Sequence, residues 1–430
     1  MDRHVIAPNT LTEAIDRAAA AIEPQLIAWR RDLHQHPELG NREFRTAGVV
    51  AEHLRALGLD EVQTGVAHTG VVGLLKGTKA GPPGPVVALR ADMDALPVSE
   101  EVDLPFASKA RARWNGEDCG VMHACGHDAH TAILMAVAAV LAGLRAQFAG
   151  TVKFIFQPAE ERPPEGERGG AELMIEEGVL RNPEPDAIFG LHVTSRLNSA
   201  TIGLRTGPLM ASADQFRIAV RGRQTHGAAP WAGVDPIVTA AQVVLGLQTI
   251  VARQLDITRE AAVVTVGAIK GGLRQNIIPD KVEMLGTVRS FDEAMREDIH
   301  GRIRDTAEGI ARAARAQCEV CIERGYDVTV NDAQLTEAML PTLRRVAGAE
   351  RVQIVPKVTG SEDFSCYQKV VPGMFFFVGV TPPGQDPTKA APNHSPRFYV
   401  DEAALLLGVR ALAHLSCDYL EAPEALRRIE

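Results

Sequence analysis

The sequence is poor in the features that mark secreted, membrane and nucleic-acid-binding proteins. It has 6 cysteines in 430 residues, and residues 1–17 contain no apolar segment typical of a secretory signal. The longest apolar run, 132–144, is too short to span a bilayer. Lysine and arginine form no runs, and the net charge is -9. We therefore expect a cytoplasmic protein with reduced thiols that binds neither nucleic acid nor membranes.

Helical and strand patterns alternate in the first half of the chain and again near its end, which is typical of an α/β layered domain. Near-continuous apolar runs such as 86–90 predict strands that are covered on both faces. The predicted helices are 11–35, 43–57, 128–147, one after 364 and one from 401; the predicted strands are 68–77, 84–97, 151–158, 186–193, 352–356 and 374–380.

The pattern of predicted helices and strands changes between residues 211 and 330, where the predicted order is β-α-β-β-α-β, the split βαβ arrangement. The predicted strands are 214–223, 261–272, 280–291 and 318–330, and the predicted helices are 234–254 and 292–316. We therefore predict an α/β fold in two parts. A discontinuous domain, 1–210 and 331–430, has a central mixed sheet flanked by helices, and a ferredoxin-like α+β domain, 211–330, is inserted into it.

Metal-binding residue types follow the predicted strands of the larger domain, where function gathers in open α/β sheets. The apolar run 86–90 is followed by Asp92 and Asp94, and four further segments carry carboxylates, imidazoles or a thiol. They are Glu160 and Glu161, the run "MHACGHDAH" with His123, Cys125, His127 and His130, then His192, and His394 in "NHSP". A lone residue of this kind is usually a solvated side chain or a helix cap, but five converging segments favour a metal site.

The chemistry of these side chains suits a transition metal. Thiolate, imidazole and carboxylate together bind Zn²⁺, Mn²⁺, Co²⁺ or Ni²⁺. The neighbouring carboxylates Glu160 and Glu161 can divide the work, one as ligand and one as base on water. The pair Cys318 and Cys321 has no second pair nearby and lies in a predicted strand, so we interpret both as packing residues.

Eight motifs together resemble the metal-dependent aminoacylase and carboxypeptidase family. More narrowly, they resemble its amidohydrolase branch, which includes hippurate hydrolase, N-acetyl-diaminopimelate deacetylase and the auxin-conjugate hydrolases. The resemblance covers nearly the whole chain. The motifs are "RADMDALP", "MHACGHDAHTA", "QPAEE", "GLHV", "THGAAP", "QNIIPD", "GSEDF" and "NHSP".

The resemblance implies a di-metal catalytic domain and an inserted lid domain that also forms a homodimer or a higher homo-oligomer. It implies two divalent metal ions per subunit, Glu160 as general base and Asp94 beneath the site. Asp92 is not expected to bind metal, and His34, His36, His123 and His130 are expected to be structural or supporting. The implied ligands are Cys125, the shared one, with His127, Glu161, His192 and His394.

The resemblance also gives roles to residues that we would otherwise read as ordinary loop or cap residues. His226 reads alone as a loop histidine, but it is implied to stabilise the oxyanion in the partner's active site. Asn276 reads as a turn residue and is implied to hold the substrate carboxylate, with Arg274 nearby. Gly360 and Ser361 open a predicted helix whose N-terminus suits a carboxylate, although Ser361 can equally be an N-cap.

Three functions remain open from the sequence. The leading prediction is hydrolysis of N-acyl amino acids, releasing a carboxylic acid and a free amino acid. The alternative is a dipeptidase or carboxypeptidase on the same scaffold, and the third is a non-catalytic metal-binding protein, which an intact Glu160 and a full ligand set disfavour. We further predict that strand 214–223 is an exposed edge through which two copies pair and bring His226 to the other chain.

Overall fold

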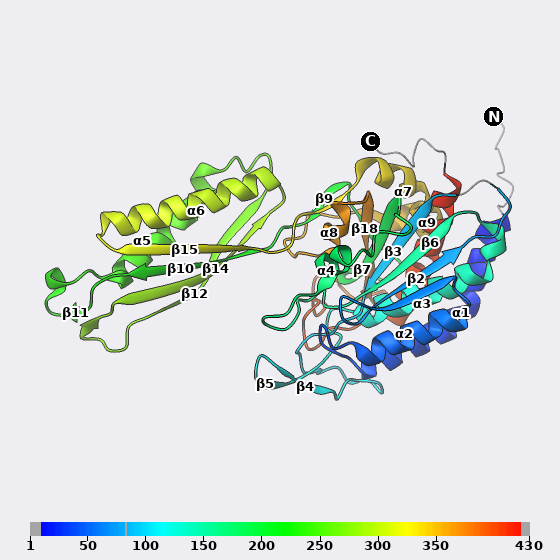
Figure 1. Cartoon of the computed structure of the whole chain (residues 1–430), viewed down its shortest axis with the longest axis horizontal. Helices are drawn as coiled ribbons and strands as arrows, with labels where there is room; N and C mark the ends of the chain where they lie inside the picture. The colour runs from blue at the N-terminus through cyan, green and yellow to red at the C-terminus, as the bar shows by residue number, and fades with distance from the viewer. Residues whose placement is uncertain (1–9, 82–83, 423–430) are drawn as a thin grey trace. The chain divides into compact units, whose positions relative to one another are not determined.

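The computed structural model describes residues 10–81 and 84–422, and their contacts divide the chain into two compact units (Figure 1). The first unit contains the described residues of 10–207, 331–355 and 366–422, and the second contains 208–330 and 356–365. The segment 356–365, which we expected in the larger domain, belongs to the second unit because its backbone hydrogen-bonds there. Val358 N donates to Leu209 O at 2.9 Å, and Ala211 N contacts Val358 O at 3.0 Å.

The first unit is built on an eight-stranded mixed sheet, as predicted. Four neighbouring strands at its centre, β6, β3, β7 and β18, run parallel, and β1, β2 and β8 add antiparallel pairings. The strands in sheet order are β1 (Glu61–Val66), β2 (Gly70–Lys76), β6 (Thr151–Gln157), β3 (Val86–Asp92), β7 (Ala187–Asn198), β18 (Gly373–Thr381), β8 (Ile202–Leu204) and β17 (Val352–Ile354).

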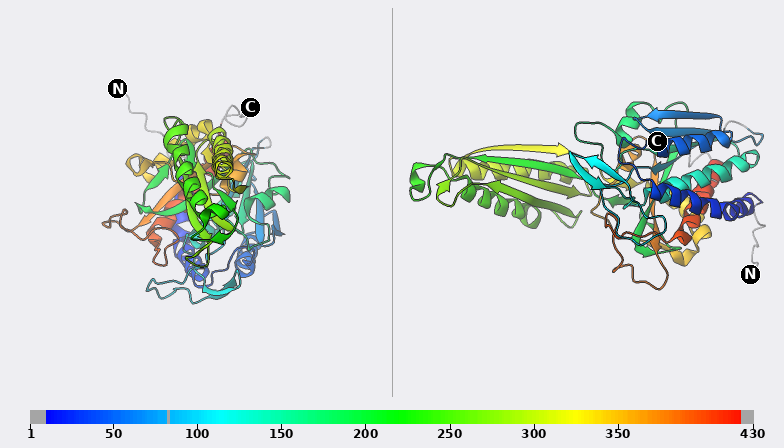
Figure 2. Two further views of the ribbon diagram at one scale, coloured as in Figure 1. Left: turned by 90° about the vertical axis from the view of Figure 1, so that its left-hand side faces the viewer. Right: turned by 90° about the horizontal axis from the view of Figure 1, so that it is seen from below.

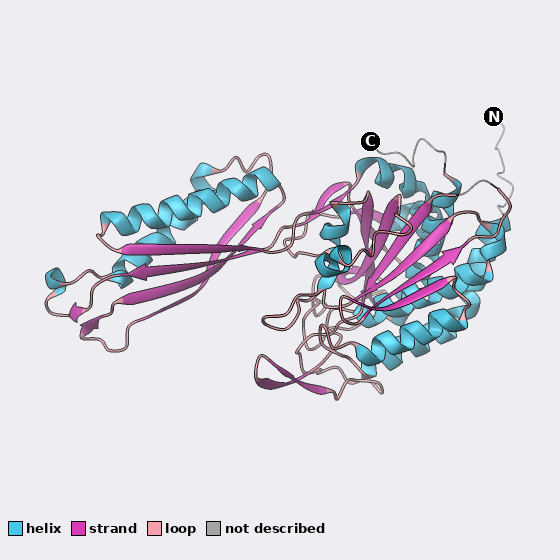
Figure 3. Cartoon of the chain, viewed as in Figure 1, coloured by secondary structure: helices cyan, strands magenta, loops and turns pink. Residues whose placement is uncertain are grey.

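Helices flank this sheet, and Figure 3 shows them in a separate colour from its strands. Alternate β3 residues Val87, Leu89 and Ala91 join α1, α3 and α9 in one apolar core, which fixes that face of the sheet. The helices are α1 (Thr10–Gln35), α2 (Phe44–Ala56), α3 (His127–Gly143), α4 (Gly170–Glu176), α7 (Ala333–Ala347), α8 (Phe364–Gln368) and α9 (Leu405–Glu421). Shorter pieces are β4 (Arg111–Trp114) and β5 (Glu117–Gly120), while β9 (Gly207–Met210) and β16 (Thr329–Asn331) lie where the chain passes from one unit to the other.

The second unit has the predicted ferredoxin-like arrangement. Its antiparallel sheet has the order β12-β14-β10-β15, and both helices lie on one face of it (Figure 2). Apolar residues of both helices and of the strands form one core. Asp235 caps α5 by accepting from Ile237 N, and Asp292 caps α6 by accepting from Met295 N. The elements are β10 (Asp214–Arg221), β11 (Thr225–His226), α5 (Pro236–Thr249), β12 (Ala262–Gly271), β13 (Ile277–Ile278), β14 (Lys281–Ser290), α6 (Glu293–Ala313) and β15 (Gln317–Arg324).

The prediction that strand 214–223 is an exposed edge is wrong. β10 lies inside the sheet and pairs along its whole length with β14 on one side and β15 on the other. The alternating sequence indicated a half-buried strand correctly, but alternation carries no information about which strands lie beside it. The edges of this sheet are β12 and β15.

Two helical stretches among the described residues are long and apolar enough to cross a membrane by length and composition: Pro236–Gln254 and Glu402–Glu421. The second is 78% buried, which identifies it as a core helix of the first unit. The first is 33% buried, and one side of its helix α5 packs on the sheet of the second unit.

Candidate metal centre

The parallel strands bring the predicted ligand segments together at their carboxyl ends. β3 ends at Asp92, and the segment with Glu160 and Glu161 follows β6. His192 lies inside β7 rather than at its end, because β7 is longer than predicted. The β3 ladder on β7 stops at the Arg90–Gly190 pair, and in the same parallel register His192 lies level with Asp92, the last residue of β3.

The thiol of Cys125 lies among the predicted ligands. Its Sγ is 3.3 Å from Nε2 of His192 and 3.2 Å from Nε2 of His394. Nε2 of His394 is in turn 3.0 Å from Oε1 of Glu161. Cys125 and His192 are buried and Glu161 is half-buried, whereas the side chain of His394 is 55% exposed.

His127 completes this group and has the hydrogen bonding expected of a metal ligand. Its Nδ1 lies 3.1 Å from Oδ1 of Asp94, while its buried Nε2 has no hydrogen-bond partner among the described residues. His192 is arranged in the same way, with Nδ1 donating to Val193 O at 2.7 Å and Nε2 directed at the thiol. A metal-binding histidine commonly donates one ring N–H to a carboxylate or carbonyl and binds with the other nitrogen.

The potential ligand atoms form overlapping triplets within 4.8 Å of one another. Three of the triplets contain only predicted ligands and the predicted base: Cys125–His127–His192, Cys125–Glu161–His394 and His127–Glu160–Glu161. Cys125, His127 and Glu161 each belong to two of these three, so the three form one continuous cluster. All five predicted ligands and the predicted base are therefore brought together.

A tight turn of the backbone allows two of these ligands to face the same space. Gly126 lies between them with φ of 88°, and a Cβ there would lie 2.3 Å from Cγ2 of Val193. Only glycine meets both requirements. α3 then begins at His127 and is apolar and buried along nearly its whole length, which anchors the turn.

The carboxylates around the cluster shift the pKa values of Cys125 and His127. Burial, and then the charges of Glu161 and Glu160, raise the pKa of the Cys125 thiol well above its usual value. Burial opposes the charged form of His127, but Asp92 and Asp94 outweigh it and raise its pKa to about 10. A bound divalent cation would neutralise the charge of the same carboxylates and stabilise the thiolate form of Cys125. The residues present thus fit a metal site.

Asp92 and His130 form a closed support beside the cluster. Nδ1 of His130 is 2.5 Å from Oδ1 of Asp92, and its Nε2 accepts from Val193 N at 2.9 Å. The other oxygen of Asp92 accepts from Nη1 of Arg90 at 2.6 Å. Both ring nitrogens of His130 are therefore in use, which agrees with the expectation that Asp92 and His130 are not ligands, although they lie in ligand range of His127.

His34 belongs to a second buried network, and His36 is exposed. His34 places Nδ1 2.8 Å from Oδ2 of Asp128 and Nε2 2.9 Å from Oε1 of Glu100. Arg30 Nε reaches the same Asp128 oxygen at 2.9 Å. Burial opposes the charged form of His34, but Asp128 and Glu100 outweigh it and raise its pKa. His123 is buried, and neither ring nitrogen has a hydrogen-bond partner within residues 10–81 and 84–422.

Asn393 is a supporting residue that the sequence analysis missed. Its Nδ2 donates to Val193 O at 3.0 Å and to Cys125 O at 3.3 Å, and His394 N donates to Ala124 O at 2.8 Å. The loop that carries His394 is thus tied to the backbone of two other ligand segments. Its position directly before a predicted ligand was the only available signal in the sequence.

The second unit holds the other predicted residues of interest on a short ribbon. β11 pairs with β13 so that His226 opposes Ile277, and Gly227 N donates to Asn276 O at 2.8 Å. Nδ1 of the exposed His226 accepts from Ala228 N at 2.9 Å. In the neutral ring this bond leaves the proton on Nε2, so the imidazole presents an N–H donor.

The predicted helix N-terminus at Gly360 and Ser361 is wrong. α8 begins at Phe364 and has only 5 residues. Oε1 of Glu362 accepts from Phe364 N at 3.0 Å, and Ser365 Oγ donates to Glu362 O. The turn is therefore closed by the residue after Ser361, and Gly360 and Ser361 remain predicted substrate contacts without a helix terminus.

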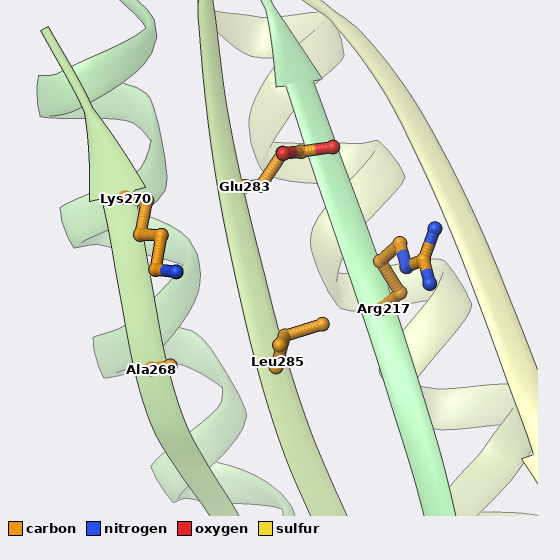
Figure 4. A pocket seen from close by; sticks show the side chains of 5 residues that line it. All are labelled: Arg217, Ala268, Lys270, Glu283 and Leu285. Atoms are coloured by element: carbon orange, nitrogen blue, oxygen red, sulfur yellow. The ribbon is translucent and has the colours of Figure 1, made fainter. Parts of the chain in front are cut away.

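A shallow pocket lies on the sheet of the second unit and contains none of the predicted site residues (Figure 4). It has a volume of about 230 Å³ and is lined by side chains of β10, β12 and β14. The lining residue Glu283 forms an ion pair with Lys281, whose Nζ lies 2.6 Å from Oε1 of Glu283. The other lining residues are Arg217, Ala268, Lys270 and Leu285.

The fold and the buried cluster are those of a metal-dependent hydrolase that acts on amide bonds, and comparison with known proteins identifies the family. The sequence profile of peptidase family M20/M25/M40 matches residues 88–418, and the chain belongs to this family.

Individual relatives cover nearly the whole chain. Thermostable carboxypeptidase 2 of Saccharolobus solfataricus is 41% identical over 94% of this chain and 97% of its own length. N-acetylcysteine deacetylase of Bacillus subtilis is 38% identical over 94% and 99%. The solved structure of the Bacillus subtilis YXEP protein, described as a dinuclear metal binding peptidase, is 36% identical with a TM-score of 0.77, covering 94% of this chain and 100% of that one.

Proposed function

We propose that this enzyme hydrolyses the amide bond of N-acyl amino acids with two divalent metal ions. The observation that carries the proposal is the continuous cluster in which a buried thiol, three imidazoles and adjacent carboxylates face one another. The residues that would hold the ions are Cys125, His127, Glu161, His192 and His394. Zn²⁺, Mn²⁺, Co²⁺ and Ni²⁺ all suit this donor set.

Glu160 is the proposed general base. It is 5% exposed and has a carboxylate oxygen within 4.8 Å of ligand atoms of His127 and Glu161. The bound ions supply Lewis acidity, which polarises the amide carbonyl and acidifies water near neutral pH. Glu160 accepts the proton of the attacking water and returns it to the nitrogen of the leaving amino acid. Asp94 keeps His127 in orientation by accepting its Nδ1–H.

The second unit supplies the proposed contacts to the other parts of the substrate. His226 offers an Nε2–H, because its Nδ1 is already occupied by Ala228 N, and such a donor stabilises the negative charge on the amide oxygen. Asn276 lies beside it on the ribbon and is proposed to bind the substrate carboxylate. Gly360, Ser361 and Arg274 are further candidates for this carboxylate.

We propose that His226 acts in a second copy of the chain within a homodimer or a higher homo-oligomer. The open edge β12 carries the exposed apolar residues Val263 and Ile269, and α5 exposes Val238 and Leu245. An unpaired edge strand beside apolar side chains supports pairing between two copies. This edge replaces β10 as the proposed pairing strand.

The proposed location is the cytoplasm, with no nucleic-acid or membrane partner. None of the six cysteines, all within the described residues, forms a disulfide, and the net charge of -9 is unfavourable for binding nucleic acid.

A carboxypeptidase or dipeptidase activity is the second candidate, supported by the 41% identity to the Saccharolobus carboxypeptidase. The deacetylase relative supports the leading candidate. The deciding experiment assays hippurate, N-acetyl amino acids and dipeptides with the protein loaded with Mn²⁺, Co²⁺ or Zn²⁺. Higher kcat/KM for the N-acyl compounds supports the proposal, and higher kcat/KM for dipeptides contradicts it.

A further inference from the structure

Glu43 stands at the start of α2 but does not cap that helix. A carboxylate in this position usually accepts a hydrogen bond from the first turn of its own helix. Glu43 makes no such bond and is fully buried. Its Oε1 accepts from Ala159 N at 2.9 Å, and its Oε2 accepts from Thr69 Oγ at 2.6 Å. The side chain therefore joins three segments that are distant in the sequence.

The segment that Glu43 holds is the turn leading into the proposed base and ligand. Ala159 is buried with φ of 53°, a left-handed conformation that is unfavourable for a residue with a Cβ. Such a conformation persists only where the surroundings fix it. The amide of Ala159 is fixed by Glu43, and the amide of Glu161 is fixed by Oδ2 of Asp94 at 2.9 Å. Buried carboxylates thus hold the backbone on both sides of Glu160.

The loop that precedes Glu43 lies directly against the same turn. A Cβ added to Gly40 would lie 2.9 Å from Arg162 O and 3.1 Å from Cβ of Ala159. Asn41 Nδ2 donates to Arg168 O at 3.0 Å, farther along the same segment. The segment 40–43 therefore packs along the segment 159–168, and Glu43 is the buried end of this contact.

We infer that Glu43 is a positioning residue, which through the Ala159 N–H and the Thr69 hydroxyl sets the turn that directs Glu160 and Glu161 into the metal cluster. This inference rests on the proposed function, because it takes Glu160 as base and Glu161 as ligand. Asp94 and Glu43 then both hold the backbone of the turn around Glu160. The sequence did not reveal this role of Glu43, because Glu43 contacts a backbone amide and not a ligand side chain.

Glutamine is the informative replacement for Glu43. Burial, and then the charge of Asp94, raise the pKa of Glu43 to about 8, which favours the neutral carboxyl group that a glutamine imitates. A glutamine accepts from Ala159 N with its oxygen and donates to Thr69 Oγ with its nitrogen. Alanine removes both bonds and leaves the left-handed turn without its support.

The test compares Glu43→Ala and Glu43→Gln with the wild type in three measurements: Co²⁺ affinity by competition with a chromophoric chelator, kcat and KM at saturating metal, and thermal midpoint. We expect Glu43→Ala to bind Co²⁺ about 10–100-fold more weakly, as for lost supports of metal ligands. Its kcat is expected to fall about 10²-fold with KM little changed, as for a misplaced catalytic group. Glu43→Gln is expected to resemble the wild type in all three.

The matched control is Lys153→Met on β6. Lys153 is also buried and anchors backbone, donating to Val179 O at 2.8 Å and Pro183 O at 2.7 Å, but it does not hold the Ala159 turn. This variant is expected to lose thermal stability and to keep wild-type Co²⁺ affinity. If Glu43→Ala also keeps wild-type affinity and kcat, or if Glu43→Gln is as impaired as Glu43→Ala, the positioning role is wrong.

The outcomes distinguish a failure of this inference from a failure of the proposed function. A wild-type protein that binds no Co²⁺ contradicts the proposed function itself. A wild type that binds Co²⁺ and hydrolyses N-acyl amino acids, with a Glu43→Ala variant that does both equally well, contradicts only the role of Glu43.

Discussion

The two groups of candidate functional residues are built in opposite ways. Around Cys125, ligand-type side chains are mostly buried and are held by further carboxylates and backbone groups. Around His226, the side chain is exposed and stands on a ribbon of two-residue strands, which has little stability of its own. All the predicted metal ligands around Cys125 lie in the first unit. In the second unit, the hydrogen bond from Ala228 N to Nδ1 of His226 fixes the tautomer of this side chain. This difference is what the proposal that His226 acts in a second copy of the chain would require.

The largest effect is expected from changes within the adjacent carboxylates. Glu160→Gln keeps size and shape but cannot accept a proton from water, so kcat should fall about 10²–10⁴-fold while metal content stays at two ions per chain. Glu161→Gln should instead lower metal content, because it removes a ligand. Steady-state kinetics and elemental analysis of the same preparations measure both effects, and exchanged phenotypes would reverse the two assignments.

A somewhat smaller effect is expected at His226. His226→Ala should lower kcat by an amount that corresponds to about 2.7–4 kcal/mol, the cost of losing one oxyanion donor. Metal content should not change, since His226 lies outside the buried cluster. This result would sharpen the contrast between a buried group that holds metal and an exposed group that acts on the substrate.

Mixing the two inactive proteins, His226→Ala and Glu160→Gln, tests whether His226 acts across a dimer. If it does, one site of a mixed dimer carries both changes and the other carries neither, so activity should reappear on mixing. If His226 serves its own chain, each site keeps one defect and activity stays low. Absence of recovery, with mixed dimers demonstrated by mass spectrometry, would exclude the role across the dimer.

The smallest effect on turnover is expected from Asp214, which shows that burial alone does not make a site. Asp214 accepts from Nε of Arg296 at 2.8 Å and lies 2.7 Å from Nε2 of His300, inside the second unit. Asp214→Asn should destabilise the fold by about 1.5–3 kcal/mol, because it removes one of the carboxylates that pair with the buried Arg296, which keeps its ion pairs to Glu293 and Asp327. kcat per folded molecule and metal content should be unchanged.

The same residue predicts acid sensitivity with a defined sign. Burial opposes ionisation of Asp214, but hydrogen bonds from Arg296 and His300 outweigh it and hold its pKa below the ordinary value of 3.8. A lowered pKa in the folded state means that the stabilisation is complete above pH 3.8 and is lost as the pH falls through the folded-state pKa. Urea denaturation should show a wild-type advantage over Asp214→Asn that is full at neutral pH and shrinks in acid. A constant difference would contradict this.

The sequence predicted most of the architecture because helix and strand periodicities are local. The order β-α-β-β-α-β over 211–330 was sufficient for the ferredoxin-like unit, and buried runs identified β3, β6 and β18. The position of β10 was missed because its neighbours β14 and β15 lie far along the chain, and alternation does not specify a partner. The assignment of 356–365 was missed for the same reason.

The candidate site was predictable where function depends on residue type and was not predictable where it depends on backbone contacts. Cys125 and His127 were visible because thiol and imidazole are rare and were found at the expected edge of a sheet. Asn393 and Glu43 were not visible, since they act through carbonyl or amide groups of segments 200 and 116 residues away. A helix-start glutamate such as Glu43 has the pattern of an ordinary cap.

The central claim, that the buried cluster holds two catalytic metal ions, is tested most directly by counting metal and activity together. The metal-free protein is titrated with Co²⁺ or Zn²⁺, and bound ions per chain are measured by elemental analysis beside hydrolysis of an N-acyl amino acid. The account predicts saturation at two ions per chain, no activity before metal is added, and fewer bound ions in Cys125→Ala. Full activity in protein shown to contain no metal, or unchanged metal content in Cys125→Ala, would contradict it.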